Sequence, residues 1–77
     1  MKVYLIYDMD EHEYLHVNTD VDETVTACCS SYDKAVDFLK KYMYKYHLIK
    51  NEGNHFTYYD PDDDYEMDFF IEEVDVL

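Results

Sequence analysis

The sequence contains few residues that break secondary structure and few that carry positive charge. Its 77 residues include one glycine, one proline and no arginine, and six lysines face 19 aspartates and glutamates. The scarcity of glycine and proline excludes a linker or a low-complexity segment. Hydrophobic residues make up 48% of the chain and aromatic residues 18%, which is too apolar for a disordered acidic tail. We therefore expect residues 1–77 to fold as a single domain.

Long hydrophobic runs are also missing. No stretch approaches the roughly 20 apolar residues that a membrane-spanning helix needs, and the apolar run at residues 3–7 is too short for a signal peptide. The two cysteines, Cys28 and Cys29, are adjacent. Neighbours on a strand point to opposite faces, so we do not expect these two to form a disulfide with each other. Reduced thiols are typical of the cytoplasm, and we expect a cytoplasmic protein with no membrane partner.

Hydrophobic patterning predicts a small α+β fold. Runs of β-branched and aromatic residues predict strands at residues 2–8, 24–29, 56–59 and 67–76. Ser30 and Ser31 offer an N-cap, and apolar residues at helical spacing predict a helix from Tyr32 to about His47. Turns are expected at residues 51–54 and 60–64. The predicted order is β-β-α-β-β, with one helix packed on one face of a small antiparallel sheet and a possible extra short strand at residues 14–17.

The negative charge is unevenly distributed along the chain. Residues 34–50 carry five lysines and one acid, a net charge of +4, whereas the rest carries 18 acids and one lysine, a net charge of −17. DNA, RNA and anionic membranes are poor partners for such a surface, because binding them begins with Lys and Arg releasing counterions. A dense anionic surface instead attracts basic partners. We therefore predict a basic, nucleic-acid-binding protein as partner, and no direct binding of nucleic acid.

Two acidic blocks and their flanking tyrosines are the candidate binding site. In extended backbone, alternate side chains share a face at a spacing of about 6.6 Å. The alternate acids from Asp60 to Asp68 could then resemble the successive phosphates of a nucleic-acid strand and occupy a groove built for one. The predicted partner-binding residues are Asp8, Asp10, Glu11, Glu13, Asp20, Asp22, Glu23, Tyr58, Tyr59, Asp60, Asp62, Asp63, Asp64, Tyr65, Glu66 and Asp68.

Each of these features also has a simpler interpretation. A run of acids can serve only to keep a protein soluble. Tyrosine is common at binding hot spots because it combines a large rigid surface with a polar tip, but a tyrosine can equally be core or edge packing. The sequence leaves both alternatives open.

Metal binding and catalysis find little support. Asp60, Asp62 and Asp64 are spaced like the start of a calcium loop. Tyr65 and Ile71, however, stand where such a loop needs glycine and glutamate. The two cysteines and four histidines lack the paired spacing of structural zinc sites. Nothing places a nucleophile beside a base, and one glycine cannot make a glycine-rich phosphate loop. We predict no metal, no cofactor, no catalytic residues and no enzyme activity.

The order of elements resembles that of short proteins encoded by bacteriophages and other mobile elements. The resemblance covers about half the chain, in an opening strand at residues 1–7, a strand and helix start at residues 28–39 and a closing strand at residues 70–76. In size and acidity the chain is similar to anti-CRISPR and anti-restriction inhibitors. This resemblance implies a non-enzymatic DNA mimic, monomeric or homodimeric, that binds a Cas effector or a restriction enzyme in the cytoplasm of a bacterial host.

A second function is also compatible with the sequence. The chain could be a small regulatory or assembly protein that binds a partner or dimerises through a sheet edge, because unpaired edges favour strand addition. The apolar end of the last predicted strand is the candidate edge.

Overall fold

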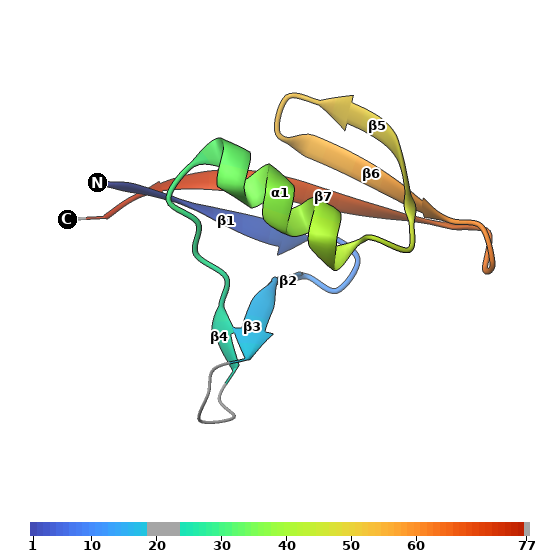
Figure 1. Cartoon of the computed structure of the whole chain (residues 1–77), viewed down its shortest axis with the longest axis horizontal. Coiled ribbons are helices and arrows are strands. Elements are labelled where there is room, and N and C mark those ends of the chain that lie inside the picture. The colour runs from blue at the N-terminus through green and yellow to red at the C-terminus, as the bar shows by residue number, and fades with distance from the viewer. Residues whose placement is uncertain (19–23, 77) are drawn as a thin grey trace.

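The structure is a computed structural model, and it describes residues 1–18 and 24–76 (Figure 1). The elements in this part of the chain are, in order, β1 (Lys2–Asp8), β2 (Glu13–Tyr14), β3 (His16–Asn18), β4 (Thr24–Thr26), α1 (Tyr32–Tyr42), β5 (His47–Glu52), β6 (His55–Asp60) and β7 (Tyr65–Asp75). A helix combined with antiparallel strands confirms the α+β class. Within residues 1–18 and 24–76, no helix is long and apolar enough to cross a membrane.

Five strands form the main sheet, in the order β2-β1-β7-β6-β5. β7 lies at its centre and pairs antiparallel with β1 from Asp75 to Phe69. β7 pairs with β6 only from Tyr65 to Phe70. From Ile71 to Asp75, β1 is the only described strand that pairs with β7. β2 and β5 form the two edges. β3 and β4 pair with each other and project from the main sheet (Figure 1).

The helix begins at a serine cap and buries one side against the sheet. The hydroxyl of Ser31 accepts a hydrogen bond from the Lys34 backbone N–H at 3.2 Å, which satisfies one free donor of the first turn. Asp33 in that turn and lysines in the last turn suit the helix dipole. The core that forms between α1 and the sheet contains Ile6, Leu15, Ala35, Leu39, Met43, Phe56, Tyr58, Phe69 and Ile71.

The helix is shorter than the sequence predicts, and the strand that follows it was not predicted. α1 ends at Tyr42 rather than near His47, and the Met43 N–H closes the last turn on the Leu39 carbonyl at 2.9 Å. Residues 47–52 instead form β5, which pairs with β6 through a turn at Gly53, whose φ is +58°. Leucine, lysine and glutamate in residues 47–52 are good helix formers, but pairing with β6 overrides that preference.

The second predicted strand is also wrong in extent and pairing. β4 covers three residues and pairs with β3, not with the main sheet. Residues 28 and 29 are not in a strand, although Cys29 exchanges backbone hydrogen bonds with Tyr4 at 2.8 and 2.9 Å. Both cysteines are free thiols.

Phe69→Ala is expected to lower the free energy of unfolding by about 3–5 kcal/mol, because it empties a core position. Phe69 is 1% exposed, whereas its neighbour Phe70 points to the other face and is 38% exposed. Phe70→Ala is the matched control, with an expected loss of less than about 1.5 kcal/mol. Urea denaturation followed by circular dichroism measures both. Equal losses would contradict the assignment of the two faces.

Candidate partner-binding surface

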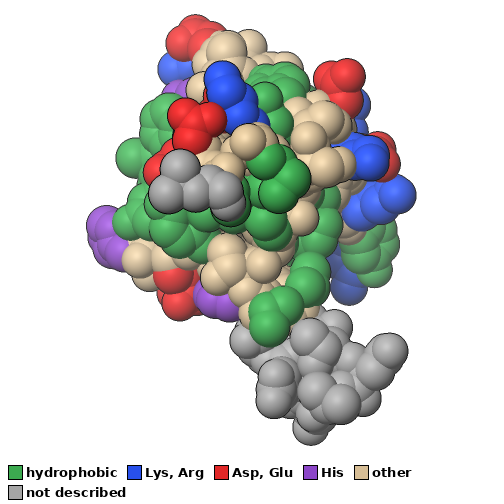
Figure 2. Space-filling model, turned by 90° about the vertical axis from the view of Figure 1, so that its left-hand side faces the viewer, with side chains coloured by type: hydrophobic (Ala, Val, Ile, Leu, Met, Phe, Trp, Pro, Cys, Tyr) green, Lys and Arg blue, Asp and Glu red, His purple; other side chains and the backbone are tan. Residues whose placement is uncertain are grey.

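No cleft or cavity forms among residues 1–18 and 24–76. In the same part of the chain no group of three or more His, Cys, Asp or Glu side chains is placed to hold a metal ion. At the end of the molecule that carries both termini, acidic, basic and hydrophobic side chains are mixed on the surface (Figure 2). The features that stand out lie at the opposite end of the sheet and on its face away from α1.

The turn after β1 is stabilised by the side chain of Asp8, the last residue of that strand. The Asp8 carboxylate oxygen Oδ1 accepts hydrogen bonds from the backbone N–H groups of Asp10 at 3.0 Å and Glu11 at 3.3 Å. His12 then takes a φ of +56°, a left-handed conformation that His tolerates better than most residues. Asp8 therefore shapes the turn, and Glu13, across from Asp8 in the β1–β2 pair, lies beside it.

The turn after β6 repeats this design. Asp60 Oδ1 accepts hydrogen bonds from the backbone N–H groups of Asp62 at 2.9 Å and Asp63 at 3.4 Å. Asp64 takes the left-handed φ of +51°, and its carboxylate accepts a hydrogen bond from the Tyr59 hydroxyl at 2.6 Å. That hydrogen bond raises the pKa of Tyr59.

The structure brings the two acidic blocks together, although some 50 residues separate them in the sequence. The Met9 N–H donates to the Asp68 carbonyl at 3.0 Å, and the Asp68 N–H donates to the Asp10 carboxylate at 3.3 Å. The pKa of Tyr65 is raised by partial burial and by the negative charge of the first block, chiefly that of Asp10. We call this region the acidic end, formed by Asp8, Asp10, Glu11, Glu13, Asp60, Asp62, Asp63, Asp64, Tyr65 and Glu66.

Tyr58 is wrongly predicted as a contact residue. Its side chain is 3% exposed and packs edge-on against Phe69, with ring centroids 6.1 Å apart. Burial raises the pKa of its hydroxyl. Because side chains alternate along β6, Tyr59 points to the other face, where it is half-buried. Tyr65 is 49% exposed and remains a candidate for contact.

The continuous row of alternate acids does not form. Asp60 ends β6, and the turn follows it, so only Glu66 and Asp68 lie in extended β7 and share a face. The carboxylates of the acidic end instead surround two tight turns. Asp20, Asp22 and Glu23, which were also predicted, lie outside the residues that the structure describes.

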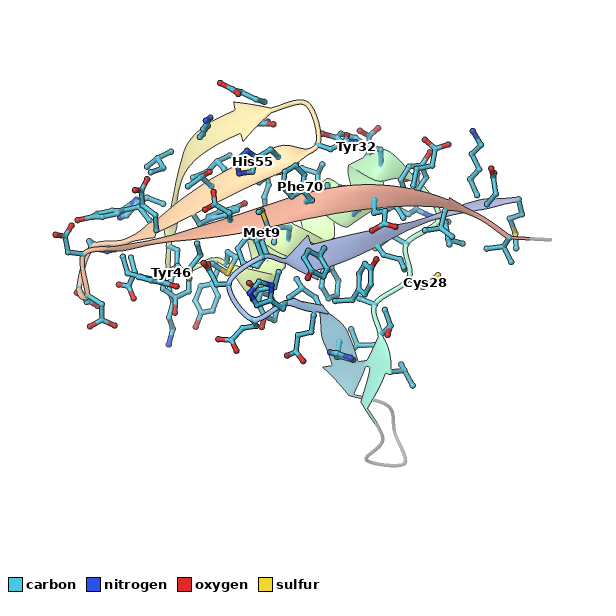
Figure 3. All side chains as sticks on the ribbon, turned by 180° about the vertical axis from the view of Figure 1, so that it is seen from behind. Met9, Cys28, Tyr32, Tyr46, His55 and Phe70 are labelled. Atoms are coloured by element: carbon cyan, nitrogen blue, oxygen red, sulfur yellow. The ribbon has the colours of Figure 1, made fainter. Side chains whose placement is uncertain are left out.

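The face of the sheet away from α1 carries a cluster of hydrogen-bonded side chains. Asp68 is the one member of this cluster that the sequence analysis predicted as a binding residue. The Asp68 carboxylate oxygen Oδ1 accepts hydrogen bonds from the Thr57 hydroxyl at 2.6 Å and from His55 Nε2 at 2.8 Å. These two donors, with Thr57 the stronger influence, lower the pKa of Asp68 against the opposing effect of partial burial. His55 also stacks on Phe70, with ring centroids 4.7 Å apart (Figure 3).

A second carboxylate on this face is held in the same way. The Tyr14 hydroxyl donates to Glu72 Oε2 at 2.6 Å, and that hydrogen bond raises the pKa of Tyr14. Tyr14 in turn packs edge-on against Tyr7, with centroids 5.2 Å apart. The alternation of residue types along residues 66–74 indicates that Asp68, Phe70 and Glu72 share a face. The sequence of this strand alone does not indicate which residues of the neighbouring strands bind them.

No protein-family model, curated protein sequence or solved structure matches this chain. A function must therefore be inferred from the acidic end and from the face of the sheet away from α1.

Thr57→Val is expected to raise the pKa of Asp68 toward its ordinary value of 3.8, because it removes the hydroxyl that donates to the carboxylate. In the native chain the folded pKa lies below the unfolded one, so the stabilising contribution is complete above the unfolded pKa. This contribution is lost as the pH falls through the folded pKa of Asp68. In Thr57→Val the contribution is smaller, so the variant loses less stability over the same pH range.

NMR titration of the side-chain carboxyl carbon measures this change. Thr57→Ser keeps a hydroxyl and should keep the lowered pKa. An unchanged pKa in Thr57→Val would show that Thr57 does not cause the shift.

Proposed function

We propose that this protein is a non-enzymatic inhibitor that acts in the cytoplasm of a bacterial host. It binds the basic nucleic-acid-binding surface of a defence nuclease, which is either a Cas effector or a restriction enzyme. Its carboxylates occupy the positions at which that surface binds the phosphates of nucleic acid. The observation that carries the proposal is the convergence of the two acidic blocks on the acidic end.

No residue in the described part of the chain neutralises the acidic end through an ion pair. Ion pairs among the described residues are Lys2–Glu73, Lys41–Asp37, Lys50–Glu52 and His55–Asp68, and none includes a residue of the acidic end. Repulsion between so many uncompensated carboxylates destabilises the folded chain. A cationic partner would relieve that repulsion and would be attracted over a distance, which gives the charge a function beyond solubility.

The alternative, assembly through a sheet edge, also has an observation in its favour. β5 is exposed along its whole length and forms an edge of the sheet, and Leu48 and Ile49 on it are 40% and 52% exposed. The end of β7, the edge expected from the sequence, has no described strand on one side, but Glu73 and Asp75 there disfavour pairing between copies because like charges repel. β5 is therefore the better edge for this alternative.

Reversing charge at the acidic end tests the proposal. Glu11→Lys, Asp62→Lys and Asp63→Lys combined should abolish inhibition, because the changed residues would repel a cationic groove. The control combines Asp33→Lys, Asp37→Lys and Asp75→Lys, an identical change in net charge at exposed positions elsewhere, and should keep most of the inhibition. DNA cleavage by a panel of purified Cas effectors and restriction enzymes measures both, with circular dichroism to verify folding.

Binding to the inhibited nuclease should be competitive with its DNA and should weaken as salt rises, because exposed charge pairs are screened. An inhibited nuclease that still binds its DNA, or equal loss of inhibition in the two variants, would contradict DNA mimicry. A stable dimer in light scattering that Ile49→Glu dissociates, with no nuclease inhibited, would favour assembly through β5.

A further inference from the structure

The face of the sheet away from α1 has no described helix or strand over it (Figures 1 and 3). We call it the open face and define it by Tyr7, Tyr14, His55, Asp68, Phe70 and Glu72. It adjoins the acidic end, because the Asp68 N–H donates to the Asp10 carboxylate at 3.3 Å. A partner bound at the acidic end can therefore extend onto the open face.

An aromatic ring lies exposed in the middle of this face. Phe70 is 38% exposed, whereas Phe69 and Ile71 on either side of it in β7 are 1% and 2% exposed. Its ring is kept parallel to that of His55, at an interplanar angle of 17°, and it stands across from Tyr7 in the β1–β7 pair. The core of the protein does not need this ring, but its exposed surface can receive another planar group.

Carboxylates flank Phe70 on both sides along β7. Asp68 and Glu72 are each two residues away on the same face, at a spacing of about 6.6 Å. Each is oriented through one oxygen, Asp68 Oδ1 by Thr57 and His55 and Glu72 Oε2 by Tyr14. Among the described residues nothing donates a hydrogen bond to Asp68 Oδ2 or Glu72 Oε1, so both oxygens are available to a donor from outside.

We propose that the open face binds arginine side chains of the basic partner, with a guanidinium stacked on Phe70 and hydrogen-bonded to Asp68 or Glu72. This inference rests on the proposed function and specifies the chemistry of its partner. Guanidinium is planar, stacks on aromatic rings and offers several donors in a fixed plane. The lysine ammonium is a compact point charge that cannot stack as a plane, so the arrangement favours arginine.

Charge argues against the other occupants. A second copy would bring its own excess of acids against Asp68 and Glu72, because the chain carries a net charge of −13. Nucleic acid would be repelled in the same way. An arginine-bearing protein surface matches both the charge and the exposed ring.

Hexa-arginine and hexa-lysine peptides of equal length and charge are the probes, and isothermal titration calorimetry at low salt measures their affinities. Hexa-arginine should bind the native chain about fivefold more tightly, a preference of the size that a stacked cation supplies. Phe70→Leu keeps an apolar side chain and should reduce that preference to less than about twofold, because it removes the ring on which only the planar guanidinium stacks. Tyr44→Leu, at an aromatic residue that is 76% exposed outside this face, is the control and should keep the preference.

The outcomes separate this inference from the proposed function. Equal affinity for the two peptides, or a preference that survives Phe70→Leu, would overturn arginine binding and leave the acidic end as a general cationic-surface binder. Failure of both peptides to bind would overturn the inference and the proposed function together. A stable dimer in light scattering that Phe70→Leu dissociates would show that a second copy occupies the face, and would also overturn the inference.

Discussion

The antiparallel pairing of β1 with β7 is the constraint on which the rest of this structure depends. It joins residues near the two ends of the chain, from Lys2 opposite Asp75 to Asp8 opposite Phe69. In this register, β1 ends opposite Phe69, four residues after β7 begins at Tyr65. The acids that follow β1 and those that precede β7 must then share one end of the sheet. Like charges that repel each other are held together by the backbone hydrogen bonds and core contacts of these two strands.

β7 also divides the chemistry of the molecule between two faces. Phe69 and Ile71 enter the core under α1, while Asp68, Phe70 and Glu72 point the other way. The half-buried carboxylate of Asp68 would be unfavourable without a hydrogen-bond donor, and the Thr57 hydroxyl supplies one. The Tyr14 hydroxyl binds the exposed carboxylate of Glu72. The Thr57 hydroxyl stabilises the charged form of Asp68, and each hydroxyl orients the carboxylate that it binds. The same strand can therefore complete the core and present an ordered binding surface.

Local signals were enough to predict part of this fold. The cap at Ser31 and the turn at Gly53 each follow from residue types at their own positions. β5 could not be predicted this way, because residues 47–52 lack clear alternation and become a strand by pairing with β6. Tyr58 was misassigned for a related reason, since the sequence does not tell which face of β6 meets the helix. The meeting of the two acidic blocks depends on strand register, and the sequence identifies the blocks without showing that they join.

The central claim is that two acidic segments far apart in the sequence act as one binding surface. The most direct test is an NMR titration of the isotope-labelled chain with a basic nucleic-acid-binding domain, followed through backbone amide chemical shifts. The account predicts that residues 8–11 and 60–68 shift together, with one common affinity, while exposed residues of α1 do not. Shifts in only one of the two segments, different affinities for the two, or shifts confined to β5 would contradict it.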